Sequence, residues 1–172
     1  MIFSLPGPFR RLLRSKRYTL RSLTLSPLTS TMHLHPYLTF DGQCRQAMTF
    51  YRECLGGELF FQTIGESPMA DQLPPEAQAF ILHASLTNGA LTILASDMVA
   101  ERGLEVGNAV SLMLDCSSEE EIRRLYYLLS DGGQRTHPLE QTFWGALFGN
   151  LTDKYGNHWL LHFDSKQSSP SQ

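Results

Sequence analysis

The same order of structural signals occurs twice between residues 34 and 164. In each half, a β-prone run precedes an amphipathic helix pattern, a Gly-Gly pair, another β-prone run and a hairpin pattern. The two pairs are Gly56-Gly57 and Gly132-Gly133, each directly after its helix pattern. A unit of this size covers one face of a small sheet with one helix, and two units together complete an adequate core. We therefore predict two tandem β-α-β-β-β modules, at about residues 34–99 and 108–164.

Hydrophobic periodicity gives the elements of the first module. Apolar side chains recur at helical spacing over residues 43–55, and the glycines that follow end the helix because they adopt left-handed conformations without strain. The expected strands are 35–40, 58–64, 80–87 and 90–96. Asn88-Gly89 is expected to form the two-residue turn of a hairpin. The stripe of the helix comprises Cys44, Ala47, Met48, Tyr51 and Leu55.

The second module follows the same scheme. A strand over 110–115 leads to a helix that ends near residue 130, and Ser118 with Glu121 has the spacing of a capping box. Strands are expected at 135–139, 145–152 and 158–163. The run 153–157 reads as a turn, in which Asp153 and Gly156 have a structural role.

Charge is distributed unevenly along the 172 residues. Residues 1–31 contain six bases and no acid, which leaves eight of the 14 bases and all 17 acids for residues 32–172. An acidic folded part argues against a nucleic-acid partner, since phosphates require clustered Lys and Arg. No apolar run approaches the roughly 18–20 residues of a membrane helix. Three Cys without a C-x-x-C pattern predict neither a disulfide framework nor a zinc knuckle, so a reducing, cytoplasmic compartment is expected.

The basic segment 1–31 is set apart from the fold. Four of its arginines lie on one face of a potential helix, as in organelle transit peptides. The segment is alternatively a tail without structure, or sequence upstream of a working start at Met32, and we prefer this second pair of explanations. A secretory signal is disfavoured because no clean apolar region follows the charges. We expect residues 1–31 and 166–172 to be disordered and residues 32–165 to form the domain. The arginines are Arg10, Arg14, Arg17 and Arg21.

The motifs resemble those of a known family. The runs 36–40, 47–51 and 56–57, followed by 141–149 and 151–159, are similar to the PhnB-like branch of the vicinal oxygen chelate (glyoxalase/bleomycin resistance/dioxygenase) superfamily. The resemblance covers about residues 34–164. It implies an α+β fold in which curved mixed sheets surround a cup, and a homodimer. Because fold does not fix chemistry, the function must come from the site.

Many relatives bind a divalent metal in this cup through three His or Glu ligands. The resemblance places the ligand positions at Tyr37, at Val110 or Ser111, and at Leu160. Val, Ser and Leu are not credible ligands, so no metal and no other cofactor is expected. A rearranged metal site that uses His35, His83 or His162 remains an alternative.

Several aromatic and imidazole side chains are candidates for the ligand pocket, since small-molecule sites are apolar with a few polar groups. His83 and His162 would form a proton-transfer pair if both faced the cup. A core or pocket histidine that is satisfied by a hydrogen bond is the plainer interpretation of His83 than a metal ligand. The pair His33 and His35 is more simply solvated than metal-binding. The pocket candidates are Tyr37, His83, Phe143, Trp144, Phe148 and His162.

Other chemistries lack their motifs. The sequence has no phosphate-binding P-loop, no G-x-G-x-x-G, no G-x-S-x-G elbow and no glycine-rich loop for a methyl-donor nucleotide, which argues against a methyltransferase. Three hypotheses follow. They are a metal-free small-molecule binding protein, a metal-dependent lyase, isomerase or thiol transferase, and a non-catalytic interaction module; the sequence does not decide whether the protein is an enzyme.

Overall fold

The computed structural model describes residues 32–68, 70–97 and 103–166. The chain divides into two units, residues 1–33 and 34–172, and every helix and strand described below belongs to the second. The predictions for residues 1–31 and for most of the C-terminal tail lie outside the described residues. No helix within the described residues is long and apolar enough to cross a membrane.

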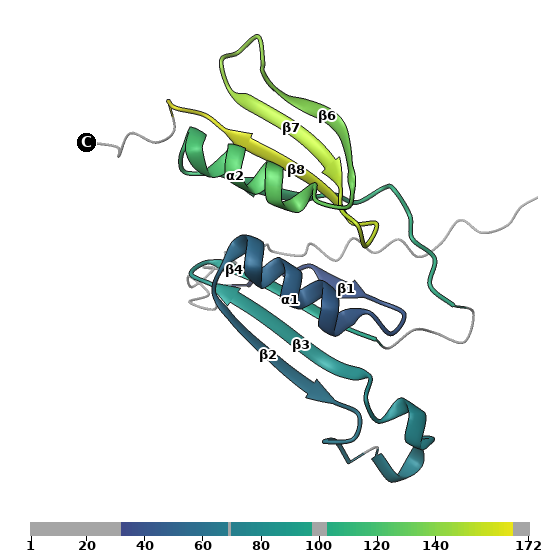
Figure 1. Cartoon of the computed structure of the whole chain (residues 1–172). Helices are drawn as coiled ribbons and strands as arrows, with labels where there is room; N and C mark the ends of the chain where they lie inside the picture. The colour runs from purple at the N-terminus through teal and green to yellow at the C-terminus, as the bar shows by residue number, and fades with distance from the viewer. Residues whose placement is uncertain (1–31, 69, 98–102, 167–172) are drawn as a thin grey trace, which may run out of the picture. The chain divides into compact units, whose positions relative to one another are not determined.

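The first module forms a four-stranded sheet of order β1-β4-β3-β2. β1 pairs with β4 in parallel, and the other pairs are antiparallel. α1 lies across one face of this sheet (Figure 1). Two short 3-10 helices, Ala70–Gln72 and Pro75–Ala77, lie between β2 and β3. The elements are β1 Tyr37–Thr39, α1 Cys44–Leu55, β2 Glu58–Thr63, β3 Ile81–Asn88 and β4 Leu91–Ser96.

The second module repeats this arrangement with the order β5-β8-β7-β6. β5 pairs with β8 in parallel, and α2 lies across the sheet as α1 does in the first module (Figure 1). The identical topology confirms the prediction of two tandem β-α-β-β-β modules in an α+β fold. The elements are β5 Leu112–Asp115, α2 Glu119–Leu129, β6 Gln134–Gln141, β7 Leu147–Thr152 and β8 His158–Phe163.

The Gly-Gly pairs have the same steric role in both modules. A Cβ atom on Gly57 would collide with the carbonyl oxygen of Thr87 on β3, and a Cβ atom on Gly133 would collide with that of Thr152 on β7. Only glycine lets the chain after each helix approach the next hairpin this closely. This repeated contact makes Thr87 and Thr152 equivalent positions of the two modules.

The hairpin turn of the first module differs from the prediction by one residue. Asn88 pairs with Leu91, so Gly89 and Ala90 form the turn and Asn88 belongs to β3. The Asn88 side-chain amide donates a hydrogen bond of 2.8 Å to the carbonyl oxygen of Leu55 at the end of α1. The prediction of an Asn88-Gly89 turn was therefore wrong, because this asparagine caps the helix instead of occupying the turn.

The start of α2 also differs in one detail. Ser118 Oγ accepts a hydrogen bond from the backbone N–H of Glu121, as a capping box requires. The Glu121 carboxylate, however, accepts from the backbone and hydroxyl of Ser117 at 2.7 and 2.8 Å instead of returning to Ser118. These bonds lower the pKa of Glu121 below its ordinary value, because they stabilise the charged form.

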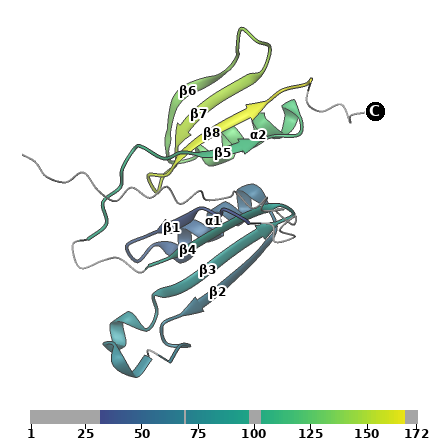
Figure 2. The ribbon, with the colours of Figure 1, turned by 180° about the vertical axis from the view of Figure 1, so that it is seen from behind.

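Each sheet has one covered and one uncovered face. The covered faces pack against the buried stripes of α1 and α2, and Figure 2 shows the opposite faces. The predicted stripe of α1 is confirmed, although Leu55 is only partly buried. The core also includes Phe50 and Cys54, which the stripe omitted. The uncovered faces are the surfaces on which a site can be built.

The carboxylate of Asp153 joins the two modules. Its Oδ2 accepts hydrogen bonds from Tyr51 Oη on α1 at 2.6 Å and from Trp159 Nε1 on β8 at 2.7 Å. Its Oδ1 accepts from the backbone N–H groups of Tyr155 and Asn157. Asp153 is only 3% exposed, so these four donors replace the water that its charge has lost.

Removing the Tyr51 hydroxyl tests this junction. We expect Tyr51→Phe to lower the free energy of unfolding by about 1–3 kcal/mol, because a buried carboxylate loses one donor and Asn157 loses its acceptor. Urea unfolding measures the change. The control is Tyr127→Phe, at an exposed tyrosine of α2, which should leave stability within about 0.5 kcal/mol of the parent. Equal stability of the two variants would contradict the role of the junction.

A second prediction concerns the glycine contacts. Gly133→Ala should lower the free energy of unfolding by about 1–3 kcal/mol, because the added methyl group meets backbone that cannot easily move. Gly107→Ala is the matched control, since a Cβ atom there meets nothing within 4 Å. Thermal unfolding of both variants compares them, and an unchanged melting temperature for Gly133→Ala would contradict the steric argument.

Candidate functional site

The uncovered face of the first sheet brings two predicted pocket residues together. Tyr37 on β1 and His83 on β3 have ring centroids 6.3 Å apart. Leu94 on β4 pairs with both Tyr37 and Ser85, so the side chains of these three residues form one row across the sheet. His83 is two residues before Ser85 and therefore lies on the same face. Tyr37 is 52% exposed, whereas His83 is partly buried. His83 is thus a residue of the uncovered face and not of the core.

The uncovered face of the second sheet brings together two more. Phe148 on β7 and His162 on β8 are directly opposite each other in the antiparallel register. His162 is in turn opposite Asp115 on the parallel strand β5, and its Nδ1 lies 2.8 Å from Asp115 Oδ1. The His162 side chain is 18% exposed and that of Asp115 is 74% exposed. This face therefore combines an aromatic ring with an imidazole bonded to a carboxylate.

The remaining two candidates lie elsewhere. Phe143 and Trp144 occupy the turn between β6 and β7, where they are 97% and 52% exposed. Their rings contact each other edge to face, with centroids 4.4 Å apart. Neither residue lines the two cavities described below.

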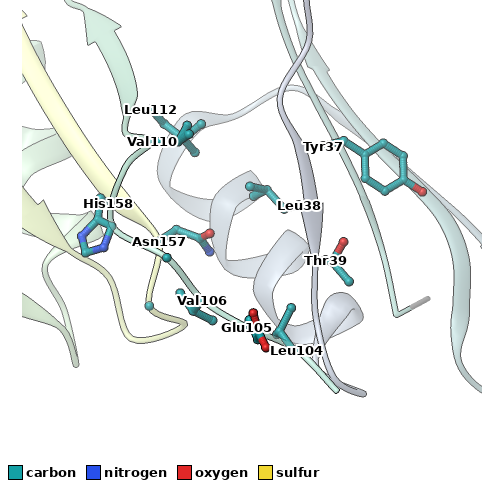
Figure 3. Close-up of a pocket in the computed structure, with 12 residues that line it drawn as sticks. Tyr37, Leu38, Thr39, Leu104, Glu105, Val106, Val110, Leu112, Asn157 and His158 are labelled. Atoms are coloured by element: carbon teal, nitrogen blue, oxygen red, sulfur yellow. The ribbon is translucent and has the colours of Figure 1, made fainter. Parts of the chain in front are cut away.

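A cavity of about 360 Å³ lies beside β1 (Figure 3). β1 forms one side, and segments 104–112 and 156–158 form the other (Figure 3). Its lining mixes aliphatic and polar side chains, and the polar ones are Tyr37, Thr39, Glu105, Asn157 and His158. His158 Nδ1 lies 2.9 Å from Thr152 Oγ1, which fixes the orientation of its ring. Of the six predicted pocket residues, only Tyr37 lines this cavity.

A second cavity, of about 400 Å³, lies between the edges of the two sheets. It is lined mainly by apolar side chains, among them Ile93, Leu112 and Trp159, and His35 borders it. The lining offers one imidazole, that of His35, and one hydroxyl, that of Ser111. These two groups do not make up the three ligands of a metal centre.

The positions expected for metal ligands do not fit a divalent cation. β5 begins at Leu112, so the predicted positions Val110 and Ser111 precede the strand. Met113 instead lies opposite Leu160 on the uncovered face. Together with Tyr37 they supply a phenol, a thioether and an alkyl group, which do not form a hard or borderline cation site. No group of three or more His, Cys, Asp or Glu side chains in the described parts of the chain is placed to hold a metal ion.

The cysteines are poor nucleophiles. Burial raises the pKa of Cys44 and Cys116 to about 12 and that of Cys54 to about 11. At neutral pH the thiols are therefore protonated, and the thiolate is the reactive form. Burial and the neighbouring Asp153 carboxylate likewise raise the pKa of Tyr51, which keeps its hydroxyl a hydrogen-bond donor.

Sequence reasoning missed Asp115 as a site residue. It was placed at the end of a strand, but its partner His162 is 47 positions away, and only the register of two parallel strands brings them together. The alternation of side chains along the strand could have indicated Asp115, because it puts this residue on the same face as Met113.

Comparisons with known proteins now bear on the fold and the site. Residues 32–162 match the family described as 3-demethylubiquinone-9 3-methyltransferase. The chain belongs to this family. Protein YjdN of Escherichia coli is 32% identical over 145 residues, which cover 79% of this chain and 98% of YjdN.

Solved structures support the same assignment. Protein PA1353 from Pseudomonas aeruginosa has a TM-score of 0.70 and 35% identity, covering 78% of this chain and 98% of that one. A putative 3-demethylubiquinone-9 3-methyltransferase, PhnB protein, from Bacillus cereus has a TM-score of 0.62 and 25% identity, covering 77% and 100%. Both the PhnB-like resemblance and the glyoxalase/bleomycin-resistance fold are confirmed, the latter also by more distant members of that superfamily.

Fluorescence tests the placement of the two tryptophans of this family member. Trp144 is half exposed and Trp159 is buried. We expect Trp144→Phe to remove most of the acrylamide-quenchable fluorescence and to shift the remaining emission to shorter wavelength, because Trp159 is shielded from water. Phe143→Leu is the control that keeps both tryptophans. Unchanged quenching in Trp144→Phe would contradict the exposed position of this residue.

Proposed function

We propose that this protein binds a small molecule at the uncovered faces of its sheets, without the metal used by many relatives. The observation that carries the proposal is the position of Tyr37. It lines the cavity of about 360 Å³ and lies within ring contact of His83. A hollow of this volume that combines apolar side chains with a small number of polar groups is typical of small-molecule sites.

The chemistry of the lining favours a small, partly aromatic or hydrophobic ligand. The aliphatic side would cover an apolar surface of the ligand, and Tyr37, Asn157 and His158 offer hydrogen bonds at its edge. Phe148 and His162 offer a second aromatic and imidazole surface on the other sheet. Phe143 and Trp144 remain pocket candidates only if the ligand or a partner reaches the exposed turn that carries them.

Oligomeric state and location belong to the same proposal. The uncovered faces expose large apolar side chains, among them Phe60 and Met113, which a second copy of the chain would cover. A homodimer should have a mass near twice 19.4 kDa in light scattering after size-exclusion chromatography.

Free Cys44, Cys54 and Cys116 favour a reducing, cytoplasmic compartment, unless the basic segment directs the chain to an organelle.

A thermal-shift screen of small hydrophobic and aromatic metabolites tests binding. A ligand present at 100 times its Kd should stabilise the fold by about 2.7 kcal/mol and raise Tm by several degrees. Tyr37→Ala should weaken this ligand about tenfold, because it removes the aromatic residue at the β1 border of the cavity. Tyr127→Ala, at an exposed aromatic residue of α2, is the matched control and should bind as the parent does.

Metal analysis and the same screen separate binding without metal from the alternative functions. Protein purified without an affinity tag should contain no stoichiometric metal, and a chelator should leave its Tm unchanged. Tightly held metal with a Tm lowered by chelator would favour a metal-dependent lyase, isomerase or thiol transferase. Stabilisation by S-adenosylmethionine would favour methyl transfer, and a screen without any hit would favour a non-catalytic interaction module.

A further inference from the structure

The cavity of about 360 Å³ beside β1 carries a negative charge that the protein does not neutralise. Glu105 is the acidic residue of its lining, and no lysine or arginine of the described chain lines it. Neither of the ion pairs formed within the described residues involves Glu105. A ligand that enters this cavity therefore meets a carboxylate that is free to pair with it.

The Asn157 side chain, which points toward β1 (Figure 3), is oriented by the buried junction. Tyr51 Oη donates its hydrogen to Asp153 Oδ2 at 2.6 Å, so toward any other group the Tyr51 oxygen can only accept. Asn157 Nδ2 donates to that oxygen at 2.8 Å. The amide of Asn157 thus turns its NH₂ end to Tyr51, and Oδ1 remains as an acceptor at the cavity.

The same hydrogen bonds carry the charge of Asp153 toward the cavity. Hydrogen bonds in a chain polarise one another, so the carboxylate polarises the Tyr51 hydroxyl, which in turn polarises the Asn157 amide. The Oδ1 atom of Asn157 becomes more negative as a result. Asp153 is only 3% exposed, so water and salt screen its charge little.

The rest of the lining suits a short hydrocarbon chain that ends in a hydrogen-bond donor. Leu38, Val106 and Leu112 supply aliphatic surface. The Thr39 hydroxyl can accept a hydrogen bond as well as donate one. An ammonium group has three donors and no acceptor, which matches a lining of acceptors.

We propose that the cavity beside β1 selects small aliphatic cations, with a protonated primary amine held by Glu105, Asn157 and Thr39. The alkyl part of the ligand packs against the aliphatic side chains. The field of the domain favours the same ligand, because residues 32–172 contain 17 acids and eight bases and attract cations. This inference rests on the proposed function and names the class of its ligand.

The competing explanation assigns no binding role to these groups. Glu105 would then be a solvated surface side chain, and Asn157 would only close the turn 153–157 through its bonds to Asp153 and Tyr51. The two explanations differ in one measurable property. If Glu105 and Asn157 only serve the fold, the charge of a ligand should not affect its binding.

Three probes with the same alkyl chain measure the effect of charge. They are n-hexylammonium, 1-hexanol and hexanoate, which are positive, neutral and negative at neutral pH. Isothermal titration calorimetry of the full-length protein at constant ionic strength gives their Kd values. We expect hexylammonium to bind about tenfold more tightly than 1-hexanol, because its hydrogen bonds are charge-assisted, and hexanoate to bind most weakly.

Glu105→Gln removes the charge and keeps the shape of the side chain. It should weaken hexylammonium about tenfold and leave 1-hexanol unchanged, since only the cation interacts with the carboxylate. Glu76→Gln is the matched control, at an exposed glutamate of the 3-10 helix Pro75–Ala77 that lines neither described cavity. An unchanged Kd in Glu105→Gln, or an equal loss in both variants, would overturn the proposal. Glu105 is exposed, so urea unfolding should show parent stability in both variants.

The position of the bound cation has a separate signature in ¹⁵N–¹H NMR. Hexylammonium should shift the side-chain NH₂ signals of Asn157, because a donor at Oδ1 changes the polarisation of the whole amide. Asn150 on β7 is the internal reference, since it lines neither cavity and its Oδ1 already accepts from Thr136. Saturating hexylammonium without a shift at Asn157 would overturn this site.

The outcomes separate this inference from the proposed function. If 1-hexanol or hexanoate binds as tightly as hexylammonium, the preference for cations is wrong, while binding of a small molecule in the cavity is retained. If none of the three probes binds, the inference is wrong as well. The metabolite screen with Tyr37→Ala then tests the proposed function independently of ligand charge.

Discussion

The buried carboxylate of Asp153 is the interaction on which the rest of the structure depends. Burying a charge away from water is costly unless it is fully hydrogen-bonded. Here the second module supplies three of the four donors, and the fourth, Tyr51 Oη, comes from α1 of the first module. Separation of the modules would leave both the carboxylate and the Tyr51 hydroxyl without this bond. The junction therefore fixes how α1 meets the start of β8.

This junction lies on the covered side of the sheets and leaves the other side available for binding. Trp159, which donates to Asp153, alternates along β8 with Leu160, so a single strand packs its odd positions into the core and presents its even positions outward. His158 and His162 are among the outward positions. The stability of the covered faces thus supports a site whose side chains contribute little to the core.

The sequence was most informative where the signal is local. The helix periodicity and the Gly-Gly pairs predicted α1 and α2 to within a residue or two, because helix contacts and stop signals lie within a few positions. The turn at Asn88 was misplaced because this side chain binds Leu55, 33 positions away. Asp115 was missed for the same reason, since its chemistry arises only from its pairing with His162. Long-range pairing is what periodicity does not encode.

The duplication explains why the two sheets can differ in chemistry without losing their fold. The contacts of Gly57 and Gly133 make Thr87 and Thr152 equivalent positions. From this equivalence Ile93 corresponds to Trp159 and Ala95 to Leu161, all of them buried and apolar. The same register matches Ser96, which is only 1% exposed, with the partly exposed His162. Covered positions must remain apolar because each packs against a helix, whereas uncovered positions face no such requirement. A carboxylate–imidazole pair could therefore arise in one module while its counterpart kept neutral hydroxyl groups, and the difference between the modules is where the chemistry of this protein should be sought.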